Sequence, residues 1–132
     1  MALTHLWDTN IAVYYTDDDL TPEARKLIDQ YLETSLPAIS AITELELLGF
    51  SKLTEDQFAQ MSTFIDSLTV IEIDEPIKKE TISIRRLKKI KLPDAIIAAT
   101  AIAYDLTLLS RNEKDFLDIK GLKFVNPFKP QH

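Results

Sequence analysis

The chain has 132 residues, and 45% of them are hydrophobic, so it can bury a core of its own and extensive disorder is excluded. It contains no cysteine, which excludes disulfides, thiolate metal sites and cysteine nucleophiles, and its two glycines are too few for a glycine-rich phosphate loop. Its formal net charge of -6 is not the charge of a simple nucleic-acid coat protein.

Short apolar runs alternate with helical patterns along the chain. In chain order, the sequence predicts a strand at residues 3–7, a helix at 21–33, a strand at 36–39, helices at 40–50 and 54–68, a strand at 69–73, helices at 74–90 and 95–105, and strands at 106–109 and 123–125. Strands that alternate with helices are typical of an α/β fold, in which helices cover both faces of a parallel sheet.

Capping residues mark where several of these helices begin. Thr21 precedes a proline at the first helical position, and Thr43 followed by Glu46 matches a capping box. Asp74 caps the long helix, and residues 92–94 (LPD) interrupt that helix before an alanine-rich one begins. These signals predict the boundaries of the elements.

Four acidic residues lie at positions that meet at one edge of such a sheet. Asp8 ends the first strand, and Glu46 lies about two helical turns beyond the second. Asp94 opens the helix that leads into the fourth strand, and Asp115 follows that strand. Because parallel sheets bind ligands at the carboxyl ends of their strands, we expect these four carboxylates to face one site.

A magnesium ion fits a site of this composition. Clustered carboxylates raise one another's pKa, and a hard divalent cation removes that cost. Such an ion prefers oxygen ligands, activates a bound water and stabilises charge on phosphoryl oxygens. The histidines are poorly placed for acid–base catalysis, because His5 lies in a predicted strand and His132 is the last residue. The acids therefore predict a Mg²⁺ site, with Mn²⁺ as an alternative ion.

The same positions carry a resemblance to the PIN-domain nucleases. Residues 6–11 (LWDTNI) resemble the first motif of that family, and residues 39–49 (ISAITELELLG) look like the second. Residues 92–101 (LPDAIIAATA) are similar to the third motif, and residues 108–116 (LLSRNEKDF) resemble the fourth. The third and fourth motifs are the specific ones, and the resemblance covers residues 3–127.

Within this family, the chain looks most like the VapC toxins of type II toxin–antitoxin systems. This resemblance implies a three-layer α/β/α sandwich with a central parallel sheet, and a Mg²⁺-dependent endoribonuclease that hydrolyses RNA phosphodiester bonds. It also implies a homodimer that a small antitoxin protein neutralises. Carried over residue by residue, the catalytic and metal-binding acids are Asp8, Glu46, Asp94 and Asp115. The supporting residues are Thr9, Asn10, Asn112 and Glu44, with Asn112 as an alternative to Asp115 at the fourth position.

Each acid also has an ordinary structural interpretation. Asp8 can simply cap the following helix, and Glu46 can complete its capping box and do nothing else. The position of Gly49 leaves Glu44 as an alternative to Glu46. Asp94 can be a first-turn acid that the helix dipole stabilises. We favour the metal site, because four unrelated caps need not lie at one edge of a sheet.

Basic residues are concentrated in one segment, residues 78–91, which holds seven basic residues and one acidic residue. At about 100° per residue, Ile77, Ile84 and Leu87 fall on one helical face and the basic side chains on the opposite face. These basic side chains are Lys78, Lys79, Arg85, Arg86 and Lys89. The pattern is that of a solvated amphipathic helix or, as a functional hypothesis, of a surface that binds the RNA backbone.

The residues alone leave two other functions open. One is a catalytically weak or inactive PIN-type module that binds nucleic acid or a partner. The other is a small-molecule phosphatase, which would require a second aspartate where this chain has Asn10. Separately, the apolar stripe of Leu47, Leu48, Phe50, Phe58, Met61 and Phe64 is either part of the core, as such helical stripes usually are, or a surface for a partner. We expect one domain over residues 1–128, a tail over 129–132, and a cytoplasmic location without a signal peptide or membrane span.

Overall fold

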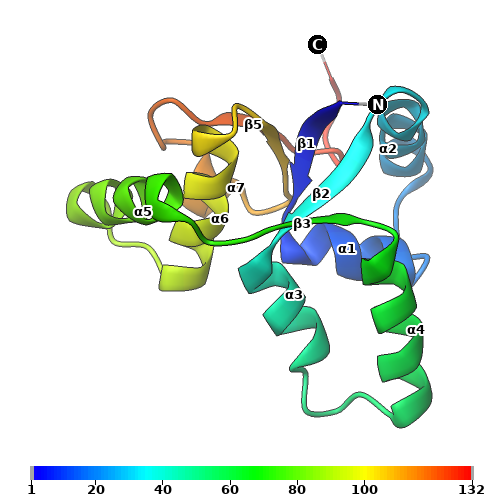
Figure 1. Ribbon diagram of the computed structural model, residues 1–132. Coiled ribbons are helices and arrows are strands. Elements are labelled where there is room, and N and C mark those ends of the chain that lie inside the picture. Colours follow the sequence, from blue (N-terminus) through cyan, green and yellow to red (C-terminus); the bar gives the residue numbers. More distant parts are fainter. Residues whose placement is uncertain (1, 132) are drawn as a thin grey trace.

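The computed structural model describes residues 2–131 and shows a five-stranded sheet between two helical layers (Figure 1). All strands are parallel, in the order β3-β2-β1-β4-β5. The strands are β1 (Leu3–Trp7), β2 (Leu36–Ser40), β3 (Thr69–Ile71), β4 (Thr107–Leu109) and β5 (Lys123–Val125). The helices are α1 (Thr9–Thr16), α2 (Pro22–Thr34), α3 (Ala41–Leu48), α4 (Glu55–Asp66), α5 (Glu75–Leu87), α6 (Leu92–Ala103) and α7 (Glu113–Phe116). The predicted α/β/α sandwich with a parallel sheet is confirmed.

Alternate residues of the central strands supply the two cores that flank the sheet. On one face, Leu6, Ala38 and Leu108 pack with α5, α6 and α7. On the other face, Trp7, Ile39 and Leu109 pack with α1, α2, α3 and α4. Burial on both faces explains why these strands are continuous apolar runs in the sequence, and why polar residues resume where each strand ends.

Several predicted helix starts are confirmed. The Thr21 hydroxyl accepts the Ala24 N–H at the start of α2, 3.2 Å away, and a proline follows at the first helical position. The Asp74 carboxylate accepts the Ile77 N–H at the start of α5, at 3.1 Å. Asp8 caps α1, as the structural interpretation of this residue predicted. Each cap satisfies a backbone N–H that the first helical turn leaves without a partner.

Helices α3 and α4 form a hairpin that extends past the carboxyl ends of the strands (Figure 1). Ser40, the last residue of β2, caps α3 through its hydroxyl. Thr43 is buried inside the helix, so the predicted capping box of Thr43 and Glu46 is wrong, and Glu46 has no capping role. The capping box of this hairpin lies instead at the start of α4, between Thr54 and Gln57.

The boundary between α5 and α6 also differs from the prediction. Helix α5 ends at Leu87 rather than near residue 90, and residues 92–94 form the first turn of α6 instead of interrupting a helix. Pro93 is tolerated there because the first turn does not use its missing N–H. Leu87, which was predicted on the same face as Ile77 and Ile84, is the last residue of the helix and is 89% exposed.

The C-terminal part adds one helix that was not predicted. Asn112 caps the short helix α7 by accepting the Asp115 N–H. After β5 the chain folds back, and Lys129 forms an ion pair with Glu113 of α7. Residue 132 of the predicted tail lies outside the described residues. Within residues 2–131, no helix combines the length and the apolar character that crossing a bilayer requires.

Candidate active site

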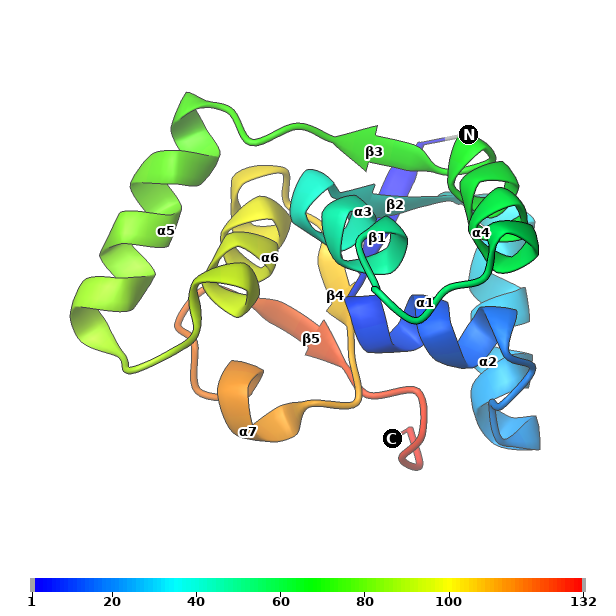
Figure 2. The same ribbon diagram turned by 90° about the horizontal axis from the view of Figure 1, so that it is seen from below.

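The four predicted acids come from four elements around the carboxyl ends of the strands. Asp8 directly follows β1, Glu46 lies on α3, Asp94 lies in the first turn of α6, and Asp115 lies on α7. Figure 2 views the molecule from this side and shows α1, α3, α6 and the segment from β4 to α7 arranged around the end of the sheet. The parallel topology therefore brings to one edge residues that are far apart in the sequence.

Asp8 is the buried member of this group, with 4% of its surface exposed. One carboxylate oxygen accepts the Thr9 N–H at 2.8 Å, and the other accepts the Ser110 hydroxyl at 2.6 Å. Burial raises the pKa of Asp8 to about 6; the two hydrogen bonds oppose this rise, and the charges of Asp94 and Glu46 add to it. Asp8 thus caps α1 and also faces the other acids.

The pKa of Asp94 is also raised, in part by neighbouring acids. Partial burial raises its pKa, the charges of Asp115 and Glu46 raise it further, and the charge of Lys91 lowers it. Asp94 is therefore within electrostatic range of Asp8, Glu46 and Asp115, and Asp8 is also within range of Glu46. Among residues 2–131, no three acidic or histidine side chains are close enough to form a ready-made metal cage. The site is an open group of carboxylates, of which only Asp8 is fully enclosed.

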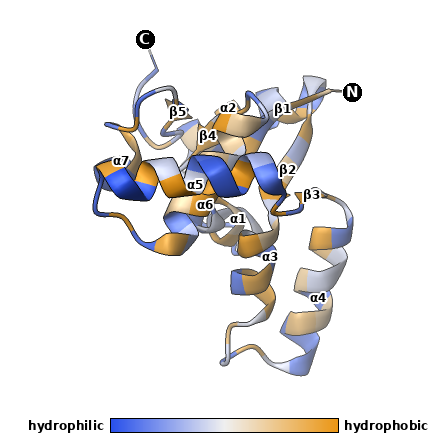
Figure 3. Cartoon of the chain, turned by 60° about the vertical axis from the view of Figure 1, so that its left-hand side comes forward, coloured by the Kyte–Doolittle hydropathy of each residue, from blue (hydrophilic) through white to orange (hydrophobic). Residues whose placement is uncertain are grey.

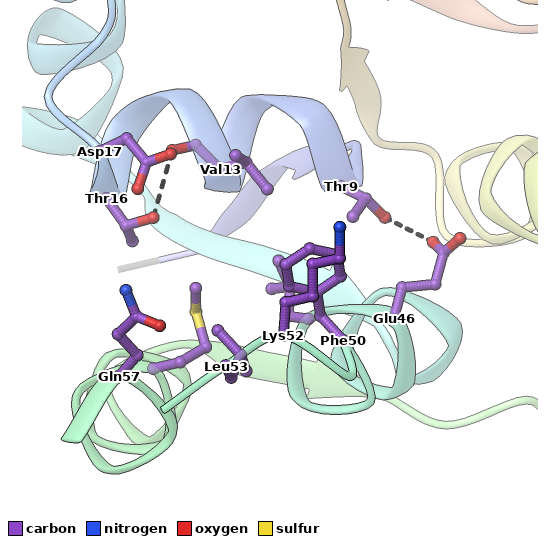
Figure 4. Close-up of a pocket in the computed structure, with 11 residues that line it drawn as sticks. Thr9, Val13, Thr16, Asp17, Glu46, Phe50, Lys52, Leu53 and Gln57 are labelled. Atoms are coloured by element: carbon purple, nitrogen blue, oxygen red, sulfur yellow. Dashed lines mark hydrogen bonds between the residues drawn. The ribbon is translucent and has the colours of Figure 1, made fainter. Parts of the chain in front are cut away.

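The structure distinguishes Glu46 from Glu44. The Thr9 hydroxyl donates to the Glu46 carboxylate at 2.7 Å (Figure 4), and the Thr43 hydroxyl oxygen lies 3.0 Å from that of Thr9. The charges that raise the pKa of Asp8 include Glu46 and not Glu44. Helix α3 therefore turns Glu46 toward the site.

Asn112 forms two hydrogen bonds with Asp115. Its side-chain oxygen accepts the Asp115 N–H at 3.2 Å, and its amide donates to the Asp115 carboxylate at 2.8 Å. These two contacts fix the orientation of the carboxylate on a helix of only four residues. The Asn112 side chain thus contacts both the backbone and the carboxylate of Asp115.

Ser110 was missed in the sequence, although it connects three of the site residues. Its buried hydroxyl donates to Asp8 and accepts the Asn112 N–H at 2.9 Å and the Asn10 side-chain amide at 3.4 Å. The signal that could have found Ser110 is its place directly after β4, at the sheet edge where Asp8 follows β1. Asn10 contacts Ser110 and the backbone of Arg111, and none of the four acids.

The basic residues predicted on the long helix are all on the surface. Four of them lie on α5, along which Figure 3 shows alternating hydrophilic and hydrophobic residues, and Lys89 follows the end of that helix. The exposed side chains are Lys78, Lys79, Arg85, Arg86 and Lys89. At the turn between α5 and α6, four basic side chains line an open pocket of about 420 Å³. One of them, Lys88, forms an ion pair with Asp118. Since Lys91 is close enough to lower the pKa of Asp94, the basic segment of residues 78–91 reaches the acidic site.

An apolar groove borders the acidic site beside Glu46. It has a volume of about 490 Å³ and lies between α1 and the α3–α4 hairpin, with Glu46 at its rim (Figure 4). Its apolar lining residues are Val13, Leu47, Phe50, Leu53 and Met61. Phe50 is 57% exposed, and Val13 is 39% exposed. Three residues of the predicted apolar stripe, Leu47, Phe50 and Met61, line this groove, and Leu47 also belongs to the core beside the sheet.

Fold and site together define a parallel α/β domain with carboxylates at the ends of its strands. A comparison with known protein families matched the PIN domain over residues 6–122. The chain therefore belongs to the PIN domain family, whose members are in general nucleases. A comparison with curated protein sequences gave no match.

Solved structures agree with this assignment. A chain of a toxin–antitoxin complex from Klebsiella pneumoniae is 32% identical, with a TM-score of 0.79, and the match covers 96% of this chain and 100% of that one. A chain of VapBC2 from Rickettsia felis, bound to a DNA fragment from its promoter, is 25% identical with a TM-score of 0.81, covering 94% and 98%. VapBC-1 from nontypeable Haemophilus influenzae shares the fold, at 21% identity and a TM-score of 0.82, covering 96% and 100%. The predicted similarity to VapC-type PIN domains is confirmed.

Proposed function

We propose that this protein is a divalent-metal-dependent endoribonuclease and the toxin of a type II toxin–antitoxin pair. The observation that carries this proposal is that Asp8, Glu46, Asp94 and Asp115 come from four elements to one edge of a PIN domain, where the charges of Asp94 and Glu46 raise the pKa of Asp8 and those of Asp115 and Glu46 raise the pKa of Asp94. A purely structural role for four separate acids does not require such an arrangement.

The donor set fits Mg²⁺ or Mn²⁺. Carboxylate oxygens are hard ligands, and both burial and neighbouring negative charges disfavour the ionised form of Asp8, a cost that a cation at the site would remove. Asp8 and Asp94 would bind the ion directly, and Glu46 and Asp115 would bind it directly or through water. When bound, such an ion supplies an activated water and stabilises negative charge on the phosphoryl oxygens.

The chain's own residues keep these carboxylates in place. The Thr9 N–H and the Ser110 hydroxyl hold the two oxygens of Asp8, and Asn112 holds Asp115. The Thr9 hydroxyl holds Glu46 and thereby links α1 to α3. Contacts of this kind orient metal ligands, and losing one typically reduces metal affinity or activity by about 10- to 100-fold.

We assign RNA binding to the basic segment, residues 78–91. An acidic protein needs a local positive surface to hold a polyanion, and Arg85, Arg86 and Lys89 provide one at the turn before α6. Lys91 continues this positive surface to Asp94. The backbone of a bound RNA would therefore run along this turn to the carboxylates.

The proposed partner is a small antitoxin protein. The solved structures described above are toxin–antitoxin complexes, and the groove between α1 and the α3–α4 hairpin offers an apolar surface that is open to solvent. Phe50 and Val13 are partly exposed there, at the rim where Glu46 lies. A partner segment with apolar side chains would cover this groove and restrict access to the site. The homodimer stays a prediction, which sedimentation velocity can test.

Incubation of the purified, antitoxin-free protein with labelled single-stranded and structured RNA tests the proposal. We expect cleavage with Mg²⁺ or Mn²⁺, none with EDTA, and a loss of at least about 100-fold in Asp94→Asn. Asp105→Asn is a matched control, because Asp105 follows the far end of α6, its side chain is 91% exposed, and asparagine tolerates its φ of 54°. Cleavage that EDTA does not affect would contradict the metal site. If no RNA is cleaved, the inactive binding module becomes the better account.

A further inference from the structure

Arg111 directly follows Ser110, and its guanidinium rests on two aromatic rings outside the acidic group. The guanidinium carbon lies 4.4 Å from the ring centre of Phe128 and 5.4 Å from that of Tyr14. One guanidinium N–H donates to the Tyr14 hydroxyl at 3.1 Å, and the two rings meet edge to face with their centres 5.0 Å apart. Residues from α1, from the end of β4 and from the segment after β5 therefore converge to hold one arginine.

Hydrogen bonds connect this cluster to the acids. The Arg111 N–H donates to the Asn10 side-chain oxygen at 3.4 Å, and the Asn10 amide donates to Ser110, which in turn donates to Asp8. Asn10 and Tyr14 lie one turn apart on α1 and share a face of that helix. Thr9 and Val13, one residue earlier in each case, face the apolar groove. The arginine thus lies beside the acidic site, on the side of α1 away from the groove.

The guanidinium is exposed and keeps most of its donors free. In residues 2–131, four ion pairs are formed, and none of them includes Arg111. Arg25 provides a contrast: its guanidinium lies 4.9 Å from the Tyr15 ring centre, but an ion pair with Asp18 at 2.8 Å neutralises it. A role limited to holding the segment after β5 against α1 would not require an exposed, charged guanidinium beside a group of carboxylates.

We propose that Arg111, held on Tyr14 and Phe128, binds a backbone phosphate of single-stranded RNA next to the phosphodiester that is cleaved. This inference rests on the proposed nuclease function and adds a second positive contact, outside the basic segment. The planar guanidinium fork matches two phosphate oxygens, and stacking on the rings fixes its direction before RNA binds. Its charge offsets the repulsion between the acids and the phosphate backbone.

The test measures RNA binding apart from cleavage, in an Asp94→Asn parent with EDTA, by fluorescence anisotropy of a labelled single-stranded RNA over a range of salt concentrations. We expect Arg111→Gln to weaken binding about tenfold at low salt, the scale of one lost bidentate charged contact. The slope of log K against log salt should fall in magnitude by about 0.7, the value for one phosphate contact. Arg111→Lys, which keeps the charge and loses the fork, should have an affinity between those of the parent and Arg111→Gln, with the slope of the parent. Arg25→Gln, which removes the neutralised arginine, should change neither quantity.

Unchanged affinity and slope in a folded Arg111→Gln protein, or unchanged affinity in a folded Arg111→Lys protein, would overturn the inference and leave Arg111 a structural residue. Circular dichroism establishes that each variant is folded, and Arg111→Lys decides the question if Arg111→Gln is not. If the parent binds RNA and the Arg111 variants bind it equally well, the proposed function survives and this inference fails. If the parent binds no RNA at all, the proposed function fails as well.

Discussion

Replacing Asp8 by asparagine should stabilise the metal-free protein at neutral pH. Burial and the neighbouring acids raise the pKa of Asp8 from the ordinary 3.8 to about 6. A carboxyl whose pKa is higher in the folded state favours folding while it is protonated. Its contribution is complete below about pH 4 and is lost as the pH rises through about 6.

The size of the effect follows from this pKa shift. About two pKa units, at 1.36 kcal/mol each, correspond to an ionisation penalty of about 3 kcal/mol at pH 7.5. Asparagine removes that penalty and can still accept the Thr9 N–H, but it loses an acceptor for the Ser110 hydroxyl, which costs about 1 kcal/mol. Asp8→Asn should therefore gain about 2 kcal/mol in the free energy of unfolding at pH 7.5, and should be about 1 kcal/mol less stable than the original protein at pH 4.

Urea denaturation in EDTA at several pH values between 4 and 7.5 measures this difference, with Asp105→Asn as the exposed control. Mg²⁺ should then stabilise the original protein and not Asp8→Asn, since a ligand that binds only the folded state raises its stability. The reasoning is refuted if Asp8→Asn is less stable at pH 7.5, or if the difference between the two proteins does not change with pH.

Three further outcomes are expected. Glu46→Gln should lower RNA cleavage at least about tenfold, whereas Glu44→Gln on the same helix should stay within about twofold; equal losses would show that the Thr9–Glu46 contact does not identify the site residue. Asn112→Ala should lower cleavage about tenfold by releasing Asp115, and an unaffected rate in a folded variant would exclude that role. Charge reversal at Arg85 and Arg86 should reduce the salt slope of RNA binding by about 1.4 while circular dichroism stays unchanged; the same slope would remove the basic segment from the RNA-binding surface.

The position of the site could be predicted because strand ends are visible in the sequence. Strands β1 and β4 are buried on both faces, so each is an apolar run that stops where the sheet reaches its carboxyl edge. Asp8 and Ser110 are the first residues after these runs. The parallel topology, inferred from the alternation of strands and helices, then places the first residues after each strand at one edge.

Helix boundaries could be predicted less well, because the same residue types and spacings occur both at the ends of helices and inside them. Thr43 and Glu46 have the spacing of a capping box, but that spacing also joins neighbours inside a helix, and Ser40 had already capped α3 where β2 ends. Pro93 can interrupt a helix or occupy its first turn, and only the end of α5 at Leu87 decides between the two. Whether a residue caps a helix, interrupts it or lies inside it depends here on packing rather than on the local sequence pattern.

The protonation behaviour of the site and its surroundings could not be predicted from the sequence. The raised pKa of Asp8 depends on how completely α1 and β4 enclose it and on the hydroxyl of Ser110. The stacking of Arg111 on Phe128 depends on the chain folding back after β5. Both are consequences of three-dimensional contacts between segments that local sequence patterns do not connect.

Anomalous diffraction from crystals grown with Mn²⁺ tests most directly whether the acids from four elements share one divalent cation. We predict a single anomalous peak at the carboxyl edge of the sheet, with carboxylate oxygens of Asp8 and Asp94 as direct ligands, and no peak there in Asp8→Asn crystals. A peak elsewhere on the protein, or none beside these two residues at saturating Mn²⁺, would contradict a shared cation site at the carboxyl edge of the sheet.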